Sequence, residues 1–238
     1  MENARTVICT KCGAQLEPDQ DYNIYRCNFC GVAFGSSILF NKDAMEKADK
    51  SLQLGEYNEA DVWYRCVLMR EPKNFMAFRG RILCAGKWKS VTEIDTEVMS
   101  EVRIKKLFKR IEEAMGHSDD EETDYFASFR KVVSVIERYC QNENEINPLN
   151  ARLAKLSEQR KQFYIQQEEA EREAEEQPVR VITEIYGETA VKNSVKEVEQ
   201  KLQPLLEQRK YLDHEFRVAR QFLIGVEKKK GIDTTQKK

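Results

Sequence analysis

Two short cysteine motifs constrain the fold of this chain more than any other feature. Cys9-x-x-Cys12-Gly13 and Cys27-x-x-Cys30-Gly31 repeat one pattern, with a fourteen-residue spacer between Cys12 and Cys27. A two-residue gap lets both thiolates of a pair reach one ion at about 2.3 Å, and two such pairs complete a tetrahedron. The glycine after each second cysteine suits the left-handed backbone needed where a chain reverses under a metal. We therefore predict one structural Zn²⁺ held by Cys9, Cys12, Cys27 and Cys30.

Segments suited to short β-strands flank the two motifs. They are residues 6–8, 22–25 and 32–34, whereas residues 17–21 predict a turn. With the paired cysteines, this pattern resembles a zinc ribbon, and the resemblance implies a small β-domain over residues 1–40. Four thiolates leave no coordination position for a water molecule, so we expect the ion to be structural rather than catalytic.

Downstream of the cysteines, apolar residues recur with helical spacing and two clear breaks. We predict helices over residues 43–54 and 58–70 and a third that begins near residue 74. Five residues of this region have a spacing that resembles that of a tetratricopeptide repeat. They are Gly55, Tyr57, Ala60, Tyr64 and Pro72. The resemblance implies stacked helix pairs whose groove binds an extended peptide or a partner's helix.

The same region is rich in basic side chains, which are Arg65, Arg70, Lys73, Arg79, Arg81, Lys87 and Lys89. They could attract an acidic peptide or a phosphate, but we favour the interpretation of a solvated helix face. A further helix is predicted over residues 92–115. Its basic stretch, residues 103–110, is interleaved with apolar residues at helical spacing, which favours an amphipathic helix over a nucleic-acid or membrane patch.

Long helices dominate the remaining sequence. Ser118 and Glu121 form a capping-box pattern that predicts a helix start, and Asn147-Pro148 predicts a boundary. Apolar residues at heptad spacing from Val191 to Val226 predict a long helix. Residues 178–187 predict a short strand or an ordered connector. We expect an antiparallel helical hairpin that packs on itself, on a second chain, or on the helical core.

These patterns together predict a mainly α protein of three parts. Residues 1–40 form the zinc ribbon, residues 41–147 a tetratricopeptide-repeat-like α-helical domain, and residues 148–238 a long helical hairpin or coiled coil. The composition agrees, because 34% charged residues with only ten Gly and five Pro are typical of long, exposed helices.

Charge and hydropathy disfavour two classes of partner. The formal net charge is −2, and the first forty residues balance Arg5, Lys11 and Arg26 against Glu2, Glu17, Asp19 and Asp21. A ribbon that grips phosphates normally offers a basic face, so nucleic-acid binding is disfavoured. No apolar run approaches the roughly 18 residues of a membrane span. The first residues show no signal-peptide pattern, so we expect a cytoplasmic protein.

We predict no catalytic residue and no cofactor-binding residue beyond the metal ligands. His117 and His214 lie in no recognisable motif and are expected at the surface, whereas Cys66, Cys84 and Cys140 fall on apolar helix faces and are expected in the core. We therefore expect no enzymatic activity.

The function that the sequence favours is that of a protein–protein adaptor. Its protein partner would bind on the ribbon face, in the helical groove or on the coiled-coil arms, and the arms are also compatible with a homo-oligomer. The alternative is a nucleic-acid-associated, transcription-related zinc-ribbon factor. A redox or metal-transfer protein is a third hypothesis, which the ribbon spacing of the cysteines disfavours.

Overall fold

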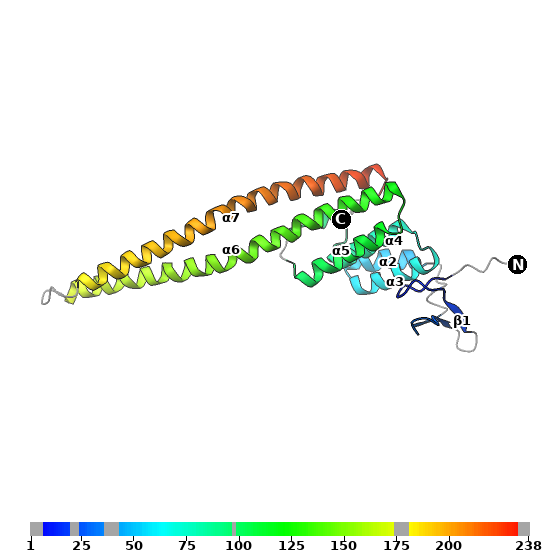
Figure 1. The fold of residues 1–238 in the computed structure, drawn as a ribbon, viewed down its shortest axis with the longest axis horizontal. Coiled ribbons are helices and arrows are strands. Elements are labelled where there is room, and N and C mark those ends of the chain that lie inside the picture. The colour runs from blue at the N-terminus through cyan, green and yellow to red at the C-terminus, as the bar shows by residue number, and fades with distance from the viewer. Residues whose placement is uncertain (1–6, 20–23, 36–42, 97–98, 174–180, 233–238) are drawn as a thin grey trace. The chain divides into compact units, whose positions relative to one another are not determined.

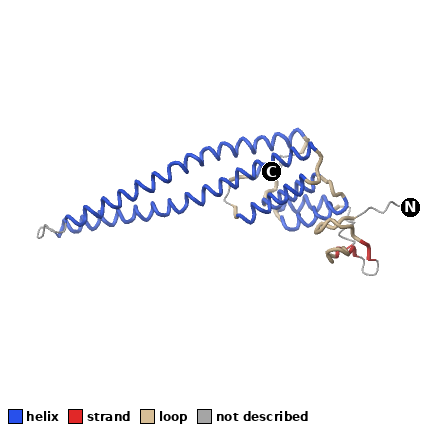
Figure 2. Tube along the Cα trace, in the orientation of Figure 1, coloured by secondary structure: helices blue, strands red, loops and turns tan. Residues whose placement is uncertain are grey.

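The chain is largely helical, with one small sheet near its N-terminus. The structure is a computed structural model that describes residues 7–19, 24–35, 43–96, 99–173 and 181–232 (Figure 1). Two compact units are present: Met1–Glu137 with Phe216–Lys238, called unit 1 here, and Arg138–Glu215, called unit 2. Strands occur only in the N-terminal part of the described chain (Figure 2). The predicted class, mainly α with an N-terminal β element, is confirmed.

The sheet has three antiparallel strands in the order β1-β2-β3. They are β1 (Glu17–Asp19), β2 (Ile24–Arg26) and β3 (Ala33–Gly35). Tyr25 lies opposite Pro18 on one side and Phe34 on the other. The turn predicted for residues 17–21 is wrong over residues 17–19, because these residues pair with β2. Pro18 is tolerated there since β1 is an edge strand, where a missing N–H costs little.

The first predicted strand, residues 6–8, is reduced to one bridge. Ile8 pairs with Gln15 across the first cysteine motif, and residue 6 lies outside the described residues. The pairing closes the loop that carries Cys9 and Cys12.

Three helices follow, and their bounds confirm the predicted ones to within a residue. They are α2 (Ala44–Leu54), α3 (Tyr57–Arg70) and α4 (Phe75–Gly86). Gly55 ends α2 with a φ of 81°, a left-handed conformation that glycine adopts without strain. Asn74 caps α4, because its side chain accepts a hydrogen bond from the Ala77 N–H at 2.9 Å.

Tyr64 joins these three helices. Its ring, 1% exposed, packs against Gly80 of α4, where an added Cβ would lie 2.2 Å from the ring. Its hydroxyl donates to a carboxylate oxygen of Asp49 on α2 at 2.7 Å. Glycine at position 80 therefore permits the close approach of α3 and α4.

The next helix begins later than predicted. Residues 91–93 form a short 3-10 turn, η1 (Val91–Glu93), and α5 covers only Glu101–Met115. The prediction of one helix over residues 92–115 is therefore wrong at its start, because the Ser100 side chain caps α5 by accepting from the Arg103 N–H at 3.4 Å. Residues 97–98 lie outside the described residues.

Two long helices complete the chain: α6 (Asp120–Glu173) and α7 (Val181–Lys229). The cap of α6 is Asp119 rather than the predicted Ser118, since an Asp119 carboxylate oxygen accepts from the Glu122 N–H at 2.9 Å. The boundary predicted at Asn147-Pro148 is wrong in the structure, because α6 continues through Pro148. An internal proline costs a helix about 3 kcal/mol, which packing of neighbours such as the buried Ile146 can offset.

The strand predicted for residues 178–187 is wrong over residues 181–187. These residues belong to α7, and residues 178–180 lie outside the described residues. The β-branched residues that suggested a strand have only a weak preference, which a helix of 49 residues overrides. Pro204 also lies inside α7.

Within unit 2, α6 and α7 run antiparallel. Arg138 pairs with Glu215 at 2.6 Å, and the Asn142 amide donates to the Leu205 carbonyl at 3.1 Å. As residue numbers rise along α6, the partners on α7 therefore fall. The guanidinium of Arg209 also donates to the Tyr139 hydroxyl at 3.0 Å and lies 4.8 Å from the ring centroid.

The apolar stripe predicted along α7 is largely buried. Its buried members are Val198, Leu202, Leu212, Phe216, Ala219 and Leu223. Among the described residues, no helix combines the length and the apolar content needed to cross a membrane.

Candidate metal centre

The four predicted ligands lie together in unit 1. Their sulfur atoms are all within 4.8 Å of one another, with Cys9 to Cys30 at 3.6 Å and Cys12 to Cys27 at 3.4 Å. Thiolates arranged tetrahedrally at about 2.3 Å from one ion would be about 3.8 Å apart. All seven cysteines are free thiols. The spacing therefore fits a single metal ion held by four sulfur ligands.

The backbone explains why the motif is repeated with its glycine. The Gly13 N–H donates to the Cys9 carbonyl, and the Gly31 N–H to the Cys27 carbonyl, each at 2.8 Å. Gly13 has a φ of 77° and Gly31 a φ of 73°, so both occupy the left-handed region, where other residues are strained. Each Cys-x-x-Cys-Gly segment thus folds into the same tight turn.

Two thiols of the cluster have pKa values that are shifted in opposite directions. Backbone hydrogen bonds, above all from Cys30, lower the pKa of the Cys27 thiol to about 6. At Cys12 the Ala14 backbone lowers the pKa, but desolvation and hydrogen bonds with the other thiols outweigh it and raise the pKa to about 12. Cys12 therefore favours its protonated thiol near neutral pH, and a metal ion that binds there would have to displace this proton.

The core around the sulfur atoms includes a residue from α3. Val7, Leu16, Cys9 and Cys27 are buried together with Met69, and Tyr25 and Phe34 pack against this group. The Ile8 N–H also donates to the Met69 carbonyl at 3.2 Å. The four-cysteine cluster therefore packs directly against the end of α3. The sequence carries no signal for this contact, because Met69 looks like any other apolar residue on α3.

One large apolar side chain of the second turn points to solvent. Phe29, between Cys27 and Cys30, is 83% exposed. The neighbouring Asn28 amide donates to a carboxylate oxygen of Glu17 on β1 at 2.6 Å, which ties the turn to the sheet. Phe29 is thus an exposed aromatic residue on a turn that is hydrogen-bonded to the sheet.

The remaining candidate residues lie where the sequence predicts. His117 and His214 are exposed, and Nδ1 of His117 lies 2.8 Å from the Glu113 carbonyl. Cys66, Cys84 and Cys140 are buried in the helical core, and burial raises the pKa of the Cys84 thiol to about 12. Within the part of the chain that the structure describes, the four N-terminal cysteines are the one cluster of three or more metal-ligating side chains.

The basic side chains of α4 are not where the sequence predicts. Residues 77–86 are all buried, and Arg79 donates to both carboxylate oxygens of Glu227 on α7, at 2.5 and 3.1 Å. Glu227 is fully buried and also accepts from the Tyr125 hydroxyl at 2.6 Å. The prediction of a solvated face is therefore wrong at Arg79, because the end of α7 supplies its counter-charge.

Arg81 is buried in a second ionic cluster. It pairs with Asp61 of α3 at 3.1 Å and with Glu113 of α5 at 2.7 Å. Arg110, in the basic stretch of α5, pairs with the same two carboxylates at 3.5 and 3.0 Å. These guanidinium groups bind the chain's own acids and are not available to an external anion.

Comparison of the chain with family models, with curated proteins and with solved structures gives no match.

Proposed function

We propose that this protein is a non-enzymatic adaptor that binds a protein partner through a metal-stapled N-terminal ribbon. The exposed Phe29, fixed between two metal ligands, carries the proposal. Aromatic side chains on rigid supports are the usual anchors of protein interfaces, because they bury much apolar area and lose little conformational freedom.

The ion is one structural Zn²⁺, bound by Cys9, Cys12, Cys27 and Cys30. Four thiolates suit zinc and complete its preferred tetrahedron, which leaves no position for a substrate or a water molecule. The zinc would hold residues 7–35 in shape and present their surface. We place the protein in the cytoplasm, where seven free thiols would remain reduced.

The helices would act as the support of the ribbon. We propose that α2 and α3 form a tetratricopeptide-repeat-like pair, supported by the Gly55 turn and the close contact of Tyr64 with Gly80. The α6 and α7 segments of unit 2 would form coiled-coil-like arms. We propose the ribbon rather than α4 as the partner surface, and the burial of α4 over residues 77–86 supports this choice.

A nucleic-acid-associated factor is the second candidate. Phe29 could stack on an unpaired base, and the exposed Lys11 occupies the corresponding turn of the first cysteine motif. The basic stretch of α5 argues against this role, because Arg110 is used in the ionic cluster and Arg103 donates to the Gly86 carbonyl.

The two roles are separated by capture on zinc-loaded full-length protein from the native lysate, with and without nuclease. We expect a stoichiometric protein partner that survives nuclease treatment and is lost with Phe29→Ala. Val102→Ala is the matched control, because Val102 is a comparably exposed apolar residue, 78%, on α5. Partners that vanish with nuclease, or that bind Phe29→Ala equally well, would overturn the adaptor proposal.

A further inference from the structure

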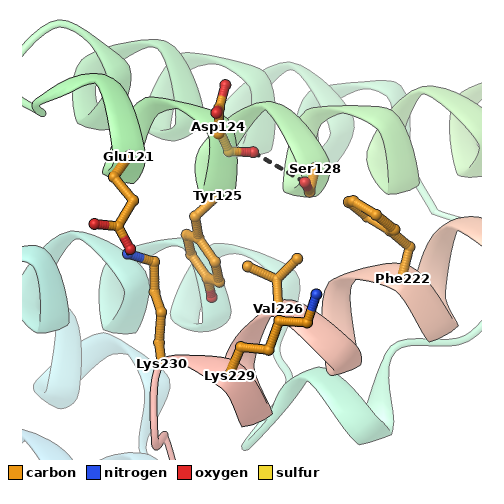
Figure 3. A pocket seen from close by; sticks show the side chains of 8 residues that line it. All are labelled: Glu121, Asp124, Tyr125, Ser128, Phe222, Val226, Lys229 and Lys230. Carbon is orange, nitrogen blue, oxygen red and sulfur yellow. Dashed lines mark hydrogen bonds and ion pairs between the residues drawn. The ribbon is translucent and has the colours of Figure 1, made fainter.

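A groove lies between the first turns of α6 and the last turns of α7, within unit 1 (Figure 3). Its cavity volume is about 500 Å³. The floor is apolar and consists of Tyr125 and Val226, and Phe222 stands at one end. The α6 rim carries Glu121 and Asp124, and the α7 rim carries Lys229 and Lys230. Acidic side chains from α6 and basic side chains from the end of α7 therefore border the apolar strip, and the Lys230 ammonium reaches the Glu121 carboxylate (Figure 3).

A protruding apolar side chain stands beside this hollow. Phe222 is 62% exposed, and Val218, four residues earlier on the same face of α7, is 54% exposed. When a partner covers an exposed aromatic side chain, the burial of its large apolar area makes the free energy of binding more favourable. The same small surface thus holds both a projection and a cavity of apolar character.

The charged edges are only partly satisfied. Lys230 pairs with Glu121 at 2.9 Å. The Asp124 carboxylate and the Lys229 ammonium make no ion pair with any residue that the structure describes, and Asp124 contributes only its backbone carbonyl to Ser128. One free charge of each sign therefore remains, on opposite edges of the groove.

We propose that this surface binds a second copy of the chain in a twofold-symmetric dimer. Two contacts fix the alignment of α6 with the end of α7: Glu121 with Lys230, and Tyr125 with Glu227. Along the helix axes, Asp124 and Lys229 therefore lie within about one helical turn of each other. A twofold axis parallel to the two helices sets α7 of each copy against α6 of the other. Phe222 of each copy then enters the opposite groove, and each Lys229 faces an Asp124.

A second copy suits this surface better than the other occupants. The chain's own residues 233–238, Asp-Thr-Thr-Gln-Lys-Lys, contain no large apolar side chain to fill the floor. A strongly acidic or strongly basic partner would be attracted by one edge and repelled by the other. Among the described residues, the surface offers one unpaired charge of each sign and an exposed aromatic side chain beside a hollow, which suits a second copy of itself.

Sedimentation equilibrium of the zinc-loaded full-length protein, at concentrations up to about 1 mM, tests the proposal. We expect a reversible monomer–dimer equilibrium that Phe222→Asp abolishes. Val102→Asp, which places the same charge at an exposed apolar position of α5, should leave it unchanged. A chain that stays monomeric throughout this range, or a dimer that Phe222→Asp does not weaken, would overturn the proposal.

A charge exchange tests the symmetry itself. Asp124→Lys and Lys229→Asp should each weaken dimerisation about tenfold or more, because each places like charges in contact across the interface. The double variant should restore the wild-type dissociation constant to within about threefold, since the pair is re-formed with its signs exchanged. If the double variant dimerises no more tightly than either single variant, the proposed arrangement is refuted.

Discussion

Replacement of Glu227 by Gln tests whether the end of α7 is integral to unit 1. In the structure this carboxylate is fully buried, holds the Arg79 guanidinium with two hydrogen bonds of 2.5 and 3.1 Å, and accepts a third from Tyr125. Arg79 itself is only 7% exposed. The substitution removes the negative charge and leaves the positive one buried.

The expected loss of stability follows from that burial. Breaking a buried ion pair from one side typically costs about 3–5 kcal/mol, because the remaining charge is uncompensated. The amide oxygen of the substituted side chain could still accept a hydrogen bond, so we expect the lower end, about 3 kcal/mol. Glu121→Gln is the matched control: its pair with Lys230, the residue after α7, joins the end of α7 to α6, but the Glu121 side chain is 83% exposed. An exposed pair contributes about 0–1 kcal/mol.

Urea unfolding followed by circular dichroism measures both variants at pH 7. We expect Glu227→Gln to lower the free energy of unfolding by about 3 kcal/mol and Glu121→Gln by less than about 1 kcal/mol. The Arg79→Met/Glu227→Met double variant should recover most of the loss, since it removes both buried charges. Equal effects of the two single substitutions would refute the view that α7 is anchored in the interior through Glu227.

Three further outcomes follow from the packing and the ligand cluster. Gly80→Ala should cost about 1–3 kcal/mol in thermal unfolding, because its Cβ would meet the Tyr64 ring, and an unchanged melting temperature would contradict the close packing. Burial raises the pKa of Glu113, but Arg81 and Arg110 outweigh this and hold it below 4.5. The Glu113 carboxylate therefore contributes stability above about pH 4.5, and this contribution is lost as the pH falls through its lower folded pKa. In denaturant titrations, Glu113→Gln should lower the free energy of unfolding at pH 7 and have little effect near about pH 2. Cys30→Ser should abolish stoichiometric zinc binding and unfold the first forty residues while the helical circular dichroism stays near native; melting of the whole chain would show that the ribbon is integral to the helical fold.

Local signals in the sequence predict much of this structure. The cysteine spacing predicts the four clustered thiols, and the Gly55 and Pro72 breaks predict α2, α3 and the start of α4. These features depend on residues close together in the chain, where spacing and backbone preference determine the outcome.

Features that depend on distant residues are not predicted. The packing of Met69 against the cysteines and the pairing of Arg79 with Glu227 join segments whose sequences show no mutual pattern. The same limit explains the misplaced boundary at Pro148, because tertiary packing along α6 outweighs a local preference of a few kcal/mol. Phe29, too, carries no sequence signal for its exposure.

The central claim is that a metal ion stabilises the ribbon and that the ribbon packs on the end of α3. Hydrogen–deuterium exchange on the zinc-loaded protein, measured before and after chelation, tests this claim most directly. We expect chelation to remove protection from residues 7–35 and to weaken it at the end of α3 around Met69. Protection along α6 and α7 in unit 2 should not change. Protection of residues 7–35 that is the same with and without the metal would contradict a structural role for the four cysteines.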